Sequence, residues 1–112
     1  MRNGFGKEYT DGYSMYEGEF KDGKKHGKGK EVFGTGNMYE GEFKNGKKHG
    51  KGKITFKNGN YYDGEWGNDM YNGKGKETYI DGSMFEGEFK DGKIIGQGKI
   101  TLKDGSTVIR YF

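Results

Sequence analysis

The two histidines are the side chains best suited to catalysis or metal binding in this chain. His26 and His49 occupy equivalent positions in two consecutive copies of a 23-residue unit. If each unit supplies two strands of a sheet, equivalent residues lie roughly 10 Å apart. Zinc–histidine bonds are about 2.0 to 2.1 Å long, so one ion cannot bind both side chains. The chain has no cysteine to complete such a site, and we therefore expect no metal.

The hydroxyl and carboxyl groups also lack a catalytic arrangement. None of the three serines lies near a histidine in the repeat geometry, so a nucleophile would have no base. Glu17, Glu40 and Glu86 are copies of one repeated position, whereas a catalytic carboxylate pair is usually unique and lies in a pocket. These patterns predict that the protein is not an enzyme.

One segment has the spacing of a nucleotide-binding motif. Gly18 to Lys24 matches the start of a phosphate-binding P-loop, but Lys25 follows where Ser or Thr would hold magnesium. The same spacing recurs at Gly41 and Gly87, and each copy spans a predicted hairpin turn. The lysines are scattered, which is weak evidence for nucleic-acid binding. We expect no nucleotide, no other cofactor and no nucleic acid.

The composition is unusual for a folded chain. Hydrophobic residues make up 29% and charged residues 33%, a balance typical of disorder. Aromatic residues reach 16%, however, and the 24 glycines recur at fixed positions. No apolar run approaches the roughly 20 residues that span a bilayer, and the first ten residues do not resemble a signal peptide. We expect a cytoplasmic protein, and its net charge of +3 is compatible with anionic partners.

The chain is built from repeats. Tyr16, Tyr39, Tyr62 and Phe85 are each 23 residues apart, and glycines follow at constant offsets. The units are a partial unit at 1–15, full units at 16–38, 39–61, 62–84 and 85–107, and a terminal strand at 108–112. Gly4 and Gly6 fit the partial unit, whereas Gly12 comes one place early. Met1 falls in mid-repeat, which fits a fragment or a short natural array.

The second full unit reads YEGEFKNGKKHGKGKITFKNGNY from Tyr39. It resembles the MORN repeat, whose pattern is roughly Y-x-G-x-[WF]-x-x-G-x-x-x-G-x-G followed by a short apolar strand. The match covers nearly the whole chain, although Gly67, Asn68 and Asp69 replace the usual turn in the third unit. The resemblance implies an adaptor or scaffold, often cytoskeletal, ciliary or membrane-associated, and sometimes appended to enzymes.

Each unit alternates in the way a β-hairpin does. Tyr39, Gly41 and Phe43 point to one face, while the intervening glutamates point to the other. Asn45-Gly46 is a strong two-residue turn between the strands. The prediction is an all-β fold, an elongated single-layer antiparallel meander of β-hairpins, twisted and groove-like and roughly 45 to 50 Å long. Rings lying on bare glycine backbone would replace a second layer.

The aromatic face is the first candidate binding surface. We expect its rings to be solvent-accessible and to bind a protein partner, as a helix or an extended peptide. The alternative is that these rings only form the core. The groove residues would be Tyr16, Phe20, Phe33, Tyr39, Phe43, Phe56, Tyr62, Trp66, Tyr79, Phe85 and Phe89.

The basic hairpin edge is the second candidate. Lysines and histidines at the turns could bind anionic phospholipid headgroups, each charge contributing about 1 kcal/mol. These residues are Lys24, Lys25, His26, Lys47, Lys48 and His49. The basic run fades in the third unit. Because lipid binding through lysines weakens at high ionic strength and an aromatic contact does not, salt distinguishes the two functions.

The terminal strand departs from the repeat. Ile109 and Tyr111 replace the usual glutamates, and Arg110 replaces a glycine. An apolar strand at the edge of a sheet favours docking. We expect either a second copy, as a homodimer through this strand, or a following segment to bind there, with a simple cap as the alternative.

Overall fold

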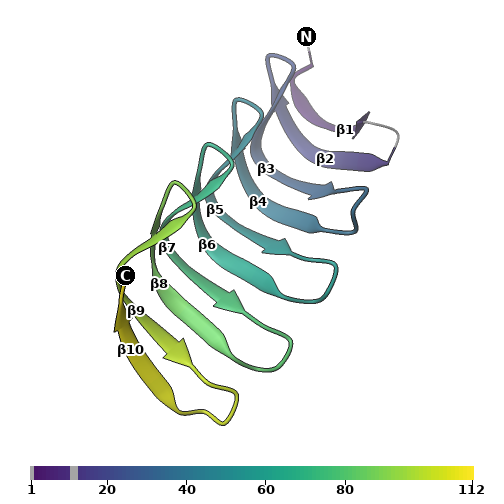
Figure 1. Cartoon of the computed structure of the whole chain (residues 1–112). Coiled ribbons are helices and arrows are strands. Elements are labelled where there is room, and N and C mark those ends of the chain that lie inside the picture. The colour runs from purple at the N-terminus through teal and green to yellow at the C-terminus, as the bar shows by residue number, and fades with distance from the viewer. Residues whose placement is uncertain (1, 11–12) are drawn as a thin grey trace.

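The computed structural model describes residues 2–10 and 13–112, which form one all-β sheet (Figure 1). The strands are β1 (Gly4–Thr10), β2 (Ser14–Lys21), β3 (Lys24–Val32), β4 (Met38–Lys44), β5 (Lys47–Thr55), β6 (Tyr61–Gly67), β7 (Met70–Thr78), β8 (Met84–Lys90), β9 (Lys93–Thr101) and β10 (Thr107–Tyr111). They lie in chain order, each antiparallel to its neighbours. The predicted meander is confirmed. Met1 and Gly12 of the partial unit lie outside the described residues.

Two-residue turns join the strands within each repeat. Asn45 and Gly46 have φ values of 52° and 83° between β4 and β5. Positive φ at both central residues defines a type I′ turn, which matches the twist of the flanking strands. In the third hairpin Asn68 and Asp69 adopt the same conformation, with φ values of 50° and 68°. Asn and Asp tolerate this region better than other non-glycine residues, so the altered turn keeps its shape.

A second kind of turn joins successive repeats. The Phe56 N–H donates to the Asn60 carbonyl at 2.8 Å, and the Gly59 N–H donates to the Phe56 carbonyl at 2.9 Å. Gly59 has a φ of 98°, a conformation that a side chain would strain. Equivalent bonds occur in the other full repeats, so the spacing between hairpins is constant along the sheet.

Each hairpin contains a bulge that the alternation of residues did not predict. Between β4 and β5, Gly41 pairs with Gly52, but Phe43 pairs with Lys48. Three residues of β5 therefore lie opposite Glu42 alone, and one of them, Gly50, has a φ of 66°. Bulges bend the strand and increase its twist. A bulge occurs in each full repeat, displaced by one residue in the fourth, and these bulges curve the whole sheet.

The bends give the array its dimensions. A straight nine-residue strand would be about 30 Å long, yet the molecule measures 50 × 25 × 18 Å. Figure 1 shows the curved strands succeeding one another along the long axis. The predicted length of roughly 45 to 50 Å is confirmed.

Candidate binding surfaces

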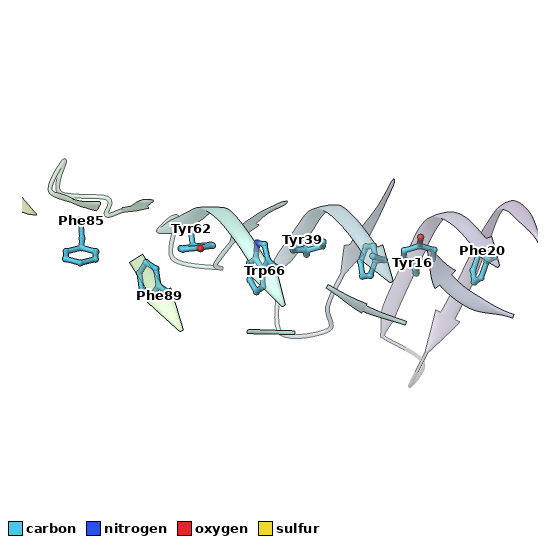
Figure 2. Packing of buried hydrophobic residues seen from close by; sticks show 8 residues of the cluster. Tyr16, Phe20, Tyr39, Tyr62, Trp66, Phe85 and Phe89 are labelled. Atoms are coloured by element: carbon cyan, nitrogen blue, oxygen red, sulfur yellow. The ribbon is translucent and has the colours of Figure 1, made fainter. Parts of the chain in front are cut away.

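The core is a single row of aromatic rings along one face (Figure 2). Tyr39 contacts Phe43 of its own strand and Trp66 of the next repeat, with ring centroids 5.0 and 5.2 Å apart. Both pairs meet edge to face, the arrangement that brings the positive edge of one ring to the negative face of another. The pattern begins at Tyr16 and continues to Phe89, so the rings of neighbouring repeats cover each other.

Each core tyrosine also fixes the bend of its own strand. The Tyr39 hydroxyl donates to the Glu42 carbonyl at 2.9 Å, which curls β4 around the ring. A Cβ atom on Gly52 would lie 2.1 Å from the Tyr39 Oη, so only glycine fits there. Burial, reinforced by the Glu42 charge, raises the Tyr39 pKa above its usual value. Burial and the Glu19 charge raise the Tyr16 pKa to about 12.

The expectation that the aromatic face is solvent-accessible is wrong for most of its rings. Tyr16, Tyr39 and Tyr62 are 0% exposed, and the other core rings reach 6% at most. Those other rings are Phe20, Phe43, Trp66, Phe85 and Phe89. The strands bend around the rings and adjacent repeats close over them, which a flat single layer would not do. Phe33, Phe56 and Tyr79, at the opposite ends of the strands, stay half-buried.

Two lysines of the hairpin edge turn toward the aromatic face. The Lys25 Nζ lies 2.6 Å from a Glu31 carboxylate oxygen and 5.5 Å from the centre of the Tyr16 ring. The Lys48 Nζ lies 5.2 Å from the Phe33 ring centre and 3.7 Å from the Asp69 carboxylate. These ammonium groups stabilise the ring face through cation–π contacts and ion pairs.

The rest of the basic edge faces solvent. Lys24, Lys47 and His49 are exposed, and His26 is half-buried. In the third repeat Tyr71 takes the place of Lys25 and Lys48, and its ring stacks on Tyr62 with centroids 3.7 Å apart. The structure therefore leaves fewer lysines free for an anionic surface than the sequence suggested.

Charged side chains form two rows across the opposite face. In the first row, which we call the first ladder, each charged residue lies opposite a residue of opposite charge on a neighbouring strand. The Lys7 Nζ, for example, lies 3.4 Å from the Glu17 carboxylate. Such pairs contribute roughly 0.2 to 1 kcal/mol each. The first ladder comprises Lys7, Glu17, Lys30, Glu40, Lys53, Asp63, Lys76, Glu86 and Lys99.

The second ladder lies one pleat away and contains Glu19, Lys28, Glu42, Lys51, Glu65, Lys74, Glu88 and Gln97. Three of its four glutamates have a structural role that the sequence pattern did not reveal. The Glu42 carboxylate accepts the backbone N–H of Lys51 at 2.6 Å, within the bulge. Glu19 and Glu65 bind the N–H groups of Lys28 and Lys74 in the same way.

Replacing Glu42 by alanine is expected to lower the free energy of unfolding by about 1 kcal/mol, because the Lys51 N–H loses a charged acceptor. Glu40 to alanine is the matched control, since Glu40 lies on the same strand in the first ladder and is exposed. Its cost should stay within about 0.5 kcal/mol. Urea unfolding followed by circular dichroism measures both. Equal losses would mean that Glu42 does not support the bulge.

A groove runs between the two ladders over the glycines. It includes a hollow of about 600 Å³ with Gly18, Gly29 and Gly41 along its floor. The same glycines are required on the other face, where the tyrosine rings lie. The walls are Glu17, Lys30 and Glu40 of the first ladder, Lys28, Glu42 and Lys51 of the second, and Phe5.

The groove continues along the array. A second hollow of about 410 Å³ shares Lys51 with the first, and a third of about 320 Å³ shares Lys74 with the second. Side chains two residues apart on one strand are roughly 7 Å apart, which sets the width between the ladders. We call this continuous feature the charged-face groove.

The terminal strand lies at the end of this face. Ile109 pairs with Lys99, and Tyr111 pairs with Gln97. Ile109 and Tyr111 therefore continue the two ladders with apolar side chains. They are 50% and 79% exposed. Phe112 instead packs on the core, with its ring centroid 5.5 Å from that of Phe85.

The structure gives no metal site among residues 2–10 and 13–112, since no three histidine, aspartate or glutamate side chains converge there. Within the same described residues, no helix is long and apolar enough to cross a membrane.

Comparison with known proteins identifies the repeat. The family model described as the MORN repeat matches four consecutive segments, residues 16–38, 39–61, 62–84 and 85–107. No curated protein matches the chain.

Proposed function

The chain belongs to the family of MORN-repeat proteins, and we propose that it is a non-catalytic scaffold that binds a polypeptide segment in its charged-face groove. MORN repeats are generally associated with protein or membrane interactions, and their all-β fold is typically a non-catalytic module.

The continuous hollow over the glycine row carries the proposal. The core rings are at most 6% exposed, so they have little surface left for a partner. The charged-face groove is open along the array, and its first hollow has a volume of about 600 Å³. The two ladders supply charged groups on both sides of this groove.

The spacing of the repeats favours an α-helix that lies along the groove. Seven helical residues advance about 10.5 Å, close to the roughly 10 Å of one repeat. An extended segment presents the same face every two residues, which is about 6.6 Å. This distance does not match the spacing of the repeats. Successive ladder charges are about 4.8 Å apart, near the rise of three or four helical residues. The proposed partner is therefore a helix whose groove-facing side alternates Glu and Lys.

Charge reversal in the groove tests this proposal. Changing Lys28 and Lys51 to glutamate should reduce retention of a helical protein partner from a lysate at least tenfold. Lys24 to glutamate with Lys47 to glutamate is the matched control, because it makes the same charge change on the hairpin turns. Partners are identified by mass spectrometry, retention is measured at about 0.15 M salt, where screening is incomplete, and folding is checked by circular dichroism.

A second candidate function rests on the hairpin turns. Lys44, Lys47 and His49 line a hollow of about 330 Å³ together with Asn45 and Asn68. Ammonium, imidazole and amide N–H groups in one hollow suit a phosphate oxygen. Vesicles with about one third phosphatidylserine test this function. If they bind the native chain, and only the variant with Lys24 and Lys47 changed to glutamate loses that binding, the turns rather than the groove are the functional surface.

A further inference from the structure

The glutamates and the lysines of the second ladder are not equally available to a partner. In each of the first three full repeats the glutamate carboxylate is bound to the bulge. The Glu42 carboxylate accepts the Lys51 backbone N–H at 2.6 Å, and the equivalent bonds in the neighbouring repeats measure 2.7 Å. A Cβ on the bulge residue Gly27 would lie 2.5 Å from the Glu19 Oε2, so this carboxylate packs directly on the bulge. One oxygen of each carboxylate is therefore already occupied by the protein itself.

The lysines of the same ladder keep their ammonium groups in solvent. Lys28, Lys51 and Lys74 are exposed, whereas Glu42 and Glu65 are half-buried. Lys51 lies opposite Glu65 across the strands, but that carboxylate binds the Lys74 N–H on the other side of β6. Within residues 2–10 and 13–112, no carboxylate lies within ion-pair distance of these three ammonium groups. We call the three side chains the lysine row.

The lysine row lies in the charged-face groove. Lys28 and Lys51 line the first hollow, Lys51 also lines the second, and Lys74 lines the second and the third. In the fourth repeat Gln97 takes the lysine position and carries no charge. The row therefore offers three positive charges to a partner that occupies the groove.

The lysines of the first ladder are a weaker site for an anion. Lys53 lies between Glu40 on β4 and Asp63 on β6, and its Nζ lies 4.2 Å from the centre of the Tyr61 ring. A cation that has two acidic neighbours and an aromatic ring face is already stabilised, so it gains little from a further carboxylate. Lys51 stands two residues away on the same strand without such an ion pair, and it gains more.

The spacing of the lysine row matches that of a helix. Successive members are two strands apart, which is roughly 10 Å, and seven helical residues advance about 10.5 Å. Carboxylates at every seventh residue of a helix would thus face Lys28, Lys51 and Lys74 in turn. A charge-assisted bond between an ammonium group and a carboxylate is stronger than a bond between neutral groups.

A polyanion fits this row less well than a helix does. Each strand of duplex DNA carries a phosphate about every 3.4 Å, so phosphates would also lie between the lysines. The strand β4 separates Lys28 on β3 from Lys51 on β5, and its Glu40 side chain is exposed there. A phosphate beside Glu40 would be repelled, whereas a helix can carry lysine at that point.

We propose that the partner helix presents an acidic residue at every seventh position and that three of these carboxylates bind Lys28, Lys51 and Lys74. The inference rests on the proposed scaffold function and specifies which charges of the partner provide the affinity. The lysines that alternate with these acidic residues contribute less, because the second-ladder glutamates that they would meet are bound to the bulges.

Three synthetic helical peptides of about 21 residues, roughly 32 Å long, test the proposal. The parent peptide carries Glu at every seventh residue of one face and Lys midway between. The second peptide has Gln in place of each of these Glu residues, and the third has Gln in place of each of these Lys residues. Affinity is measured by fluorescence anisotropy at about 0.05 M salt, where screening is weak. The loss of Glu should weaken binding about tenfold, and the loss of Lys less than about twofold.

Two protein variants with the same change of net charge serve as the matched pair. Lys51→Gln should weaken binding of the parent peptide about threefold, whereas Lys53→Gln should leave it nearly unchanged. The peptide that lacks Glu should bind both variants equally. Circular dichroism checks the fold of each variant, and the amide chemical shifts of Gly29 and Gly41 show whether a peptide occupies the groove.

The outcomes separate this inference from the function on which it rests. If the glycine amides shift but the three peptides bind equally, or Lys53→Gln weakens binding as much as Lys51→Gln, the inference is wrong and the groove is still a helix site. If a single-stranded thymidine oligonucleotide displaces the parent peptide as well as unlabelled parent peptide does, the row binds polyanions and the inference is also wrong. If none of the peptides shifts the glycine amides, the proposed function fails as well.

Discussion

Replacing Gly52 by alanine is expected to lower the free energy of unfolding by about 3 kcal/mol, the upper end of the usual cost of overpacking. The added Cβ would lie 2.1 Å from the Tyr39 Oη and 2.4 Å from its Cζ. The ring cannot move away, because its hydroxyl is bound to the Glu42 carbonyl and its face is packed against neighbouring rings. Urea unfolding at constant temperature measures the loss.

Gly6 provides the matched control for this substitution. It occupies the Gly52 position two repeats earlier, in β1, which is the first strand of the sheet among the described residues. The three atoms nearest to a Cβ on Gly6 would all belong to the Arg2 side chain, the closest at 3.3 Å. Because that side chain is exposed and can change rotamer, Gly6→Ala should cost less than about 1 kcal/mol. Similar losses at both positions would refute the role of ring packing on glycine.

Replacing Tyr39 by alanine is expected to cost about 3 to 5 kcal/mol, the range for removing a buried aromatic ring. Tyr39 is 0% exposed and contacts Phe43 and Trp66, so its removal leaves a cavity between two repeats. Tyr39→Phe keeps the ring and loses only the bond to Glu42, which should cost about 1 kcal/mol. Denaturant unfolding of both variants separates the ring from the hydroxyl, and equal losses would contradict this account.

The expected loss at Tyr39 also determines how binding can be tested. A variant that removes a core ring changes the fold together with any surface, so a lost partner would have no single explanation. Lys28 and Lys51 are exposed on the groove wall, and their side chains can be changed with the rings in place. The charged-face groove is therefore open to tests that the aromatic face does not allow.

The repeat pattern was sufficient to predict the strands and the turns that join them, although not the bulges. Alternating polar and apolar residues set the strands, and the Asn45-Gly46 dipeptide set the turn, because both depend on neighbouring residues alone. The constant 23-residue spacing then placed Glu17 opposite Lys30 and fixed the length of the array. The altered turn at Asn68 and Asp69 did not change this outcome, since both residues tolerate positive φ.

The tertiary structure alone decided which face is open. The alternation of residues predicts that Tyr39 and Gly52 lie on one face. It does not predict how strongly the strands bend between them. That bend arises when the ring packs on the glycine of the next strand and Glu42 caps the bulge. Such contacts join residues on different strands, which the order of residues in one strand does not encode. They bury the rings, draw Lys48 inward and leave the open groove on the charged face.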